Sequence, residues 1–152
     1  MAIKPVKKEN LTLLQEKYQK FWTMFNLVSS QDNNFASNFK VHPIASIRYY
    51  QDYAIGKPYE IGIRINFEKG VASVHAYFNN LVVYEEFYTR YRDSIESMIG
   101  KHLEWKEMKT KAYARLYLTF PYQISDMSNW SKVCEDIIPY AVLMKKVFNN
   151  YD

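Results

Sequence analysis

The segment from residue 60 to residue 78 restricts the fold more than any other part of this chain. In EIGIRINF (60–67), every second residue is an isoleucine or a phenylalanine, and the positions between them are polar, charged or glycine. A period of two is typical of a strand that buries one face. The triplet EKG (68–70) then makes a tight turn into VASVHAYF (71–78). The two segments predict an antiparallel hairpin.

The same alternation recurs in KAYARLYLTF (111–120), the clearest strand of the sequence. One side of this strand is expected to face the core and consists of Ala112, Ala114, Leu116, Leu118 and Phe120. The other side carries Lys111, Tyr113, Arg115, Tyr117 and Thr119. An aromatic and β-branched segment at 44–54 predicts one more strand, and 102–105 predicts a short extended piece.

Three amphipathic segments predict helices over 9–29, 82–99 and 128–149, because apolar residues recur in them at steps of three and four. Asn10 is the expected N-cap of the first helix. Gly100 is the expected left-handed residue that ends the second helix.

The exposed side of the second helix carries opposite charges at a spacing of four residues. We expect the ion pairs Glu86–Arg90 and Arg92–Glu96 there. The stretch 29–40, rich in serine and asparagine, shows no period and is predicted to be a loop.

These elements follow one another in the order α-β-β-β-α-β-α, which favours an α+β fold with a mainly antiparallel sheet packed against helices. A length of 152 residues suits one domain. We therefore expect residues 1–152 to form a single domain, with residues 1–8 as a flexible basic tail.

The composition favours a cytoplasmic protein. The single cysteine, Cys134, cannot form an internal disulfide, which suits a reducing compartment. No apolar run approaches the roughly 18 residues that a membrane helix needs, so no membrane partner is expected. Charged residues also follow the basic start of the chain, where a signal peptide would need an apolar stretch.

Charge and aromatic content leave the type of partner open. Lys4, Lys7 and Lys8 against Glu9 supply half of the formal net charge of +4, so the remaining chain is only weakly basic. Fourteen tyrosines are unusual for this length, and tyrosine is enriched in protein interfaces and in base-stacking surfaces. A tyrosine-rich rim of a small core is the alternative interpretation.

The sequence predicts no enzyme, no metal site and no cofactor. His42, His75 and His102 lack the spacing of metal ligands, and Cys134 lies on the apolar stripe of a helix. The triplet Glu104–Trp105–Lys106 resembles the (Asp/Glu)-x-Lys element of metal-dependent nucleases. That alternative needs an upstream aspartate on a neighbouring strand. Asp93 lies on the solvent side of the second predicted helix, and Asp52 lies on a distant earlier strand, so neither is well placed for it.

The outward side of the predicted sheet gathers basic and aromatic side chains, and it is the candidate binding surface. Its residues are Arg64, Tyr77, Lys111, Tyr113, Arg115 and Tyr117. This pattern suits the stacking of bases in DNA or RNA, with arginine or lysine against phosphates. It equally suits docking of a protein partner or a second copy of the chain, or coverage by a helix.

Several segments together resemble a known family. They are YQKFWTMF (18–25), IESMIGKHLEW (95–105) and the strand that starts at residue 111. The matching positions are Phe21, Trp22 and Phe25; Ile95, Glu96, Gly100, Leu103 and Trp105; and Lys111, Ala112 and Arg115. The chain is similar to an uncharacterised bacterial domain family usually found at the C-terminus of restriction-endonuclease-like proteins.

The resemblance implies a role in nucleic-acid processing or phage defence, without implying nuclease activity for this domain. Together with the outward side of the sheet, the resemblance leaves three functions open. The first is a non-catalytic accessory protein that acts through a protein partner. The second is a small inhibitor or modulator of a nucleic-acid enzyme. The third is direct nucleic-acid binding by the tyrosine and arginine face.

Overall fold

The computed structural model describes residues 11–56, 59–122, 124 and 126–151. Within these residues the chain forms one five-stranded antiparallel sheet with the strand order β1-β2-β3-β5-β4. The strands are β1 (Tyr50–Ala54), β2 (Tyr59–Asn66), β3 (Val71–Phe78), β4 (Glu104–Met108) and β5 (Tyr113–Pro121). The helices are α1 (Leu13–Gln31), α2 (Asn33–Asn38), α3 (Leu81–Glu86), α4 (Arg92–Ile99) and α5 (Trp130–Asn149). The predicted α+β class is confirmed, and the predicted element order matches roughly.

The hairpin that the alternation predicts is present as β2 and β3. Its register runs from Tyr59 opposite Phe78 to Asn66 opposite Val71. Gly70 takes a left-handed φ of 67° in the connecting turn, which a side chain would strain. All the isoleucines of β2 are buried, as the period of two requires.

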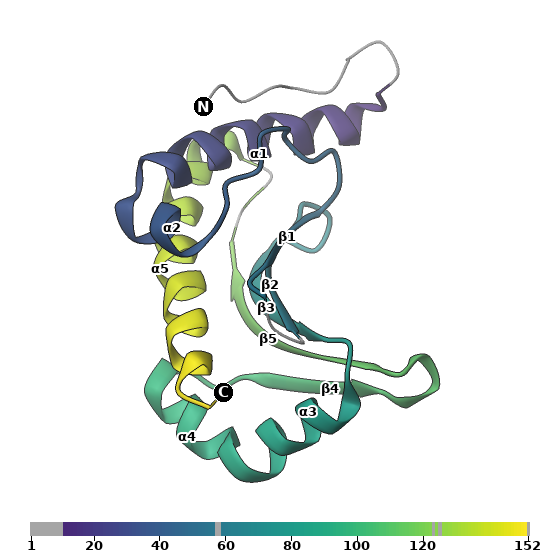
Figure 1. Cartoon of the computed structure of the whole chain (residues 1–152). Helices are drawn as coiled ribbons and strands as arrows, with labels where there is room; N and C mark the ends of the chain where they lie inside the picture. Colours follow the sequence, from purple (N-terminus) through teal and green to yellow (C-terminus); the bar gives the residue numbers. More distant parts are fainter. Residues whose placement is uncertain (1–10, 57–58, 123, 125, 152) are drawn as a thin grey trace.

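The core lies between one face of this sheet and the helices, which Figure 1 shows on a single side of the strands. Aromatic rings fill much of it. Phe21 of α1 packs edge-to-face against Trp130 of α5, with ring centroids 5.5 Å apart, and against Phe67 after β2. The sheet contributes smaller residues, such as Ala76 and Leu116, to the same cluster. Large helix side chains therefore interdigitate with a sheet surface of mixed size.

A buried polar network joins α1 to β1. The amide groups of Asn26 and Gln51 hydrogen-bond each other at 2.7 and 3.2 Å, and Nε2 of Gln51 also donates to the Tyr53 hydroxyl at 3.0 Å. These polar groups are removed from water, so they need the hydrogen bonds that they make with one another. The network therefore favours one position of α1 relative to β1. Burial raises the pKa of the Tyr53 hydroxyl well above its usual range.

Several predicted boundaries are wrong. α1 begins with Thr12 as N-cap, in a capping box with Gln15, whereas Asn10 lies outside the described residues. The predicted loop at 29–40 contains the end of α1 and the short helix α2, which Asp32 caps by accepting from the backbone N–H of Phe35. β1 covers only the last five residues of the segment predicted at 44–54. At the start of α1 and at α2, a local capping residue sets the helix boundary where the apolar periodicity is weak.

The predicted helix at 82–99 is interrupted. A π-helical turn at Phe87–Tyr91 separates α3 from α4. Gly100 ends α4 with a φ of 76°, as predicted. Of the two expected ion pairs, Glu86–Arg90 is present at 3.2 Å, whereas Glu96 bonds other groups and does not pair with Arg92.

β5 starts two residues later than predicted. Lys109–Lys111 form a 3-10 turn, and Ala112 follows with a left-handed φ of 56°. The strand alternation therefore cannot be extended back through these residues, and Ala112 is exposed where the sequence predicts core. The expected basic tail at 1–8 lies outside the described residues. None of the helices in the described ranges is long and apolar enough to cross a membrane.

Candidate functional site

The face of the sheet opposite the helices carries the candidate site. None of the described helices lies over this face (Figure 1). Cross-strand pairing aligns its side chains in rows, one of which runs Asp52, Gly62, His75, Tyr117 and Glu104 across all five strands. Side chains in such rows contact their neighbours directly, so the strand register decides which functional groups meet.

Arg64 forms the centre of the first cluster on this face. Its Cζ lies 5.3 Å from the ring centroid of Tyr49 and 5.6 Å from that of Tyr117. Both rings attract the cation through their π faces. Nε of Arg64 is buried and has no hydrogen-bond partner among the described residues. We call Tyr49, Arg64 and Tyr117 the first Arg–Tyr stack.

Arg115 forms a second cluster of the same kind. Its Cζ lies 5.0 Å from the ring centroid of Tyr77 and 5.3 Å from that of Tyr113, and the two rings are themselves 5.3 Å apart. Nε of Arg115 is likewise buried without a partner in the described part of the chain. We call Tyr77, Tyr113 and Arg115 the second Arg–Tyr stack.

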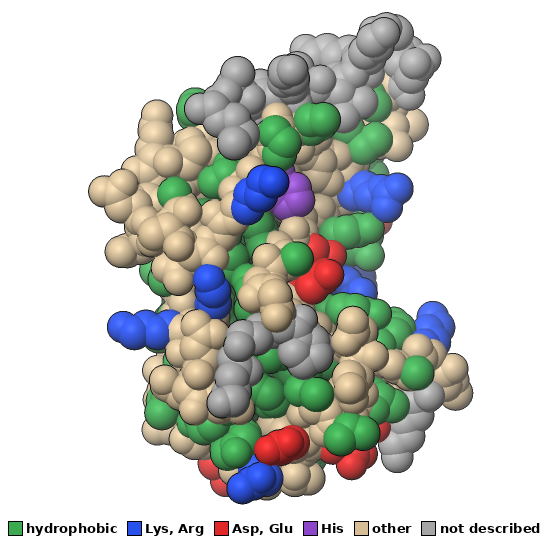
Figure 2. Space-filling model, viewed as in Figure 1, with side chains coloured by type: hydrophobic (Ala, Val, Ile, Leu, Met, Phe, Trp, Pro, Cys, Tyr) green, Lys and Arg blue, Asp and Glu red, His purple; other side chains and the backbone are tan. Residues whose placement is uncertain are grey.

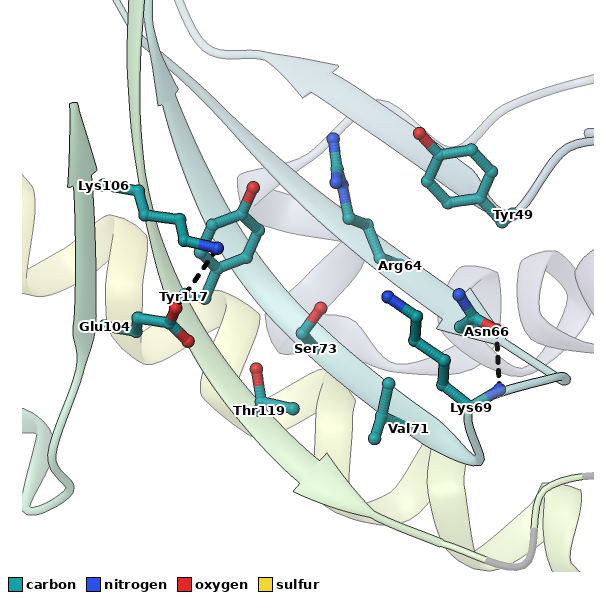
Figure 3. A pocket seen from close by; sticks show the side chains of 10 residues that line it. All are labelled: Tyr49, Arg64, Asn66, Lys69, Val71, Ser73, Glu104, Lys106, Tyr117 and Thr119. Atoms are coloured by element: carbon teal, nitrogen blue, oxygen red, sulfur yellow. Dashed lines mark hydrogen bonds and ion pairs between the residues drawn. The ribbon is translucent and has the colours of Figure 1, made fainter. Parts of the chain in front are cut away.

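A hollow of about 290 Å³ lies beside the first stack. Figure 3 shows the residues that line it, which come from β2, β3, β4, β5 and two connecting segments. They are Tyr49, Arg64, Asn66, Lys69, Val71, Ser73, Glu104, Lys106, Tyr117 and Thr119. The ammonium of Lys106 pairs with Glu104 at 3.4 Å. With Arg64 and Lys69 added, positive charge exceeds negative charge in this hollow.

Asp52 and His75 form a pair on the same face. Nε2 of His75 lies 3.1 Å from Oδ1 of Asp52, and the histidine is 1% exposed. The pair crosses over Gly62, where an added Cβ would lie 2.6 Å from Nε2 of His75 and closer still to Asp52. Gly62 therefore leaves the space in which the pair forms. Burial and the nearby Asp52 raise the pKa of Glu60 next to this row.

The geometry does not assemble the nuclease element that the Glu104–Trp105–Lys106 triplet suggests. Asp52 and Glu104 share a row but belong to the two edge strands, four strand spacings or about 19 Å apart. Among the described residues, no group of three His, Cys, Asp or Glu side chains could hold a metal ion. Burial raises the pKa of the Cys134 thiol to about 12, which keeps it protonated.

The structure brings together five of the six predicted binding residues. Arg64 and Tyr117 meet in the first stack, and Tyr77, Tyr113 and Arg115 meet in the second. The sixth, Lys111, lies exposed in the turn before β5 and does not share the face through strand alternation.

Sequence reasoning missed Tyr49, Lys69 and Lys106, which complete the surroundings of Arg64. The triplet with Glu104 was the available signal for Lys106, and the hairpin turn was the signal for Lys69. Tyr49 precedes β1, and its carbonyl accepts from the backbone N–H of Ile65. Only the register of β1 places its ring over Arg64, so the sequence carried no comparable signal.

The fold and the site define an α+β domain with two arginine–tyrosine clusters on a sheet face that the described helices leave uncovered. Residues 17–152 match the family described as "Domain of unknown function (DUF4268)", and the chain belongs to this family. Comparison with curated proteins and with solved structures finds no match.

Proposed function

We propose that this domain is a non-catalytic binding module that docks a partner protein on the open face of its sheet. The observation that carries this proposal is the pair of Arg–Tyr stacks. Tyrosine and arginine are the side chains that most often dominate protein interfaces, because each combines a large contact area with directed polar groups. Here two arginines and four tyrosines occur on the face that the described helices leave uncovered.

The charges on the face favour a protein over a nucleic-acid strand. The basic residues Arg64, Lys69, Lys106 and Arg115 share it with the carboxylates of Asp52, Glu60 and Glu104. Figure 2 likewise shows basic and acidic side chains interspersed over the visible surface. A dedicated nucleic-acid surface presents a basic stripe, because every phosphate carries charge. A mixed surface suits a partner with charges of both signs.

We place the partner in a nucleic-acid-processing or phage-defence system, either as an enzyme that this domain assists or as one that it inhibits. This part of the proposal rests on the resemblance of the sequence to domains associated with restriction-endonuclease-like proteins. The non-catalytic role is supported by the separation of Asp52 from Glu104 and by the buried, protonated Cys134.

Affinity capture from the native host tests the proposal. The wild-type protein, the double variant Tyr113→Ala with Arg115→Ala, and the control Arg90→Ala are used as baits. Arg90 is an exposed arginine in the π-helical turn, paired with Glu86 and outside the sheet face. We expect a partner that wild type and control retain and that the double variant loses, while its urea unfolding midpoint stays close to that of wild type.

Titration with single- and double-stranded DNA and RNA at two salt concentrations completes the test. Micromolar binding whose affinity falls steeply with salt would show that the partner is a nucleic acid and not a protein. Unfolding of the double variant would show that the tyrosines are packing residues, and the docking face would then be wrong.

A further inference from the structure

The arginines of the two stacks have their hydrogen-bond donors unused. A guanidinium carries five N–H groups in its own plane, and its two faces carry none. In each stack the guanidinium of the arginine lies over tyrosine rings. No ion pair or hydrogen bond joins Arg64 or Arg115 to any other side chain in the described part of the chain. The planar edge of each cation therefore remains available to a ligand.

Partial burial makes these free donors costly. The Nε of both arginines is removed from water without a partner, and an unsatisfied buried donor costs more than the same donor in solvent. A carboxylate that binds the outer N–H groups of a guanidinium compensates the charge and uses the bidentate geometry that arginine favours. The neighbouring tyrosine rings restrict the orientation of each guanidinium before a ligand binds.

The hollow beside Arg64 adds further donors for the same kind of ligand. Ser73, Thr119 and Lys69 line this hollow together with Arg64, and Figure 3 shows the ammonium end of Lys69 below Arg64 and beside Ser73. Lys106 also lines the hollow and stands directly opposite Arg115 in the pairing of β4 with β5. This lysine is thus adjacent to both arginine clusters.

The distribution of charge selects between a polyanion and separated acidic groups. Between the two arginines the face presents His75, which is buried, and the neutral Tyr117. Carboxylates flank this path on both sides, with Asp52 towards β1 and Glu104 on β4. A strand with a phosphate at every nucleotide would meet these carboxylates. A peptide with two acidic side chains and neutral residues between them would not.

The spacing of the arginines follows from the register. Arg64 pairs with Ser73 and Arg115 with Tyr77, so their Cα atoms are two strands and four residues apart, about 17 Å in a flat sheet. Residues i and i+4 of an extended segment lie about 14 Å apart on the same face. The long side chains of arginine and glutamate span the remainder.

We propose that the two Arg–Tyr stacks are paired carboxylate receptors that bind two glutamate or aspartate side chains, four residues apart, in an extended acidic segment of the partner protein. This inference rests on the proposed docking face and names the chemistry of its partner. It assigns specificity to Arg64 and Arg115 and a supporting role to Lys69 and Lys106.

The arginine Nε–H resonances of the full-length protein provide the test, since a buried Nε–H exchanges slowly enough to be observed by NMR. The probe is the blocked peptide Glu-Ser-Thr-Ser-Glu, and the controls replace one or both glutamates by glutamine. We expect saturable shifts of the Arg64 and Arg115 signals with the first peptide. Affinity should fall about tenfold with one glutamate, the loss expected for one charge-assisted contact, and saturable shifts should vanish with none.

Arg64→Lys and Arg115→Lys keep the charge but remove the planar guanidinium with its paired N–H donors. Each should weaken peptide binding about tenfold, whereas the control Arg90→Lys should not weaken it. Equal shifts with the glutamine peptide, or no saturable shift with the glutamate peptide, would overturn the receptor proposal. Tighter binding of a twelve-residue oligothymidine would assign the stacks to phosphates instead. If the peptide does not bind but the Tyr113/Arg115 double variant still fails to capture the partner, the docking face is supported. Only the proposed acidic segment is then wrong.

Discussion

The carboxylate of Glu96 accepts a hydrogen bond from the indole Nε1 of Trp105 at 3.1 Å. The same oxygen accepts from the backbone N–H of Leu103, also at 3.1 Å. The left-handed Gly100 ends α4 between Glu96 and Leu103, and the chain then continues into β4. The residues that carry the family resemblance in this segment thus form a structural link between a helix and an edge strand, and none of them lies on the proposed docking face.

Glu96→Ala should destabilise the fold. The substitution removes the acceptor of a backbone N–H and of an indole N–H that are both partly buried, and we expect a loss of about 1–3 kcal/mol. Urea unfolding followed by tryptophan fluorescence measures it. Asp93→Ala is the matched control, because that carboxylate is 96% exposed on the same helix and should change stability by less than about 0.5 kcal/mol. Equal effects of the two substitutions would show that the link contributes nothing.

Gly62→Ala should destabilise the sheet without touching the hydrophobic core. The new Cβ would collide with both Asp52 and His75, and the histidine is fully buried and cannot move aside. Overpacking of this kind costs about 1–3 kcal/mol, which chemical denaturation resolves. In an Asp52→Ala background one of the colliding groups is gone, so the cost of Gly62→Ala should shrink. An undiminished cost in that background would place the strain elsewhere.

Phe21→Ala should be among the most damaging substitutions in α1. Its ring is fully buried against Trp22, Phe67 and Trp130, and truncation of a buried phenylalanine costs about 3–5 kcal/mol. Leu13→Ala on the same helix is the control, because Leu13 is 86% exposed. A loss below about 1 kcal/mol for Phe21→Ala would contradict the packing of α1 on α5 and the sheet.

The strands and core were more predictable from sequence than the helix ends and the site. Strict alternation determines which side of β2 and β5 faces the core, because a shift by one residue would expose every isoleucine of β2. The π-helical turn had no such signal, and α2 had only the capping residue Asp32. Both also depend on tertiary contacts, such as the burial of Phe35 and Phe87 in the core.

The site was predictable only as a list of outward residues. Alternation put Tyr113, Arg115 and Tyr117 on one side of β5, but it could not show which arginine stacks on which tyrosine. That depends on the pairing of β5 with β3, which the order of the strands along the chain does not determine. The positive φ of Ala112, which removes Lys111 from the face, is equally a property of the folded turn.

Raising the pH above about 9 should lower the free energy of unfolding. Burial raises the pKa of the Cys134 thiol from 9.0 to about 12, and burial together with Glu107 raises that of Tyr84 from 10.0 to about 12. Below pH 9 these groups are protonated in both the folded and the unfolded chain, so they do not change the free energy of unfolding. Between about pH 9 and 12 the unfolded chain releases protons that the folded chain retains, so the free energy of unfolding falls as pH rises.

Urea unfolding at pH 8 to 11 measures this loss, and the control variant is Cys134→Ala. The buried thiol contributes at most about 1.4 kcal/mol per pH unit, the energy equivalent of one pKa unit. The alanine variant should therefore show a shallower decline while starting from a lower stability at pH 8, because it leaves a small cavity. The folded protein should also react with a thiol reagent at pH 8 far more slowly than the chain in urea. Parallel pH profiles of the two proteins, or rapid labelling of Cys134 in the folded state, would show that this helix position is open to solvent.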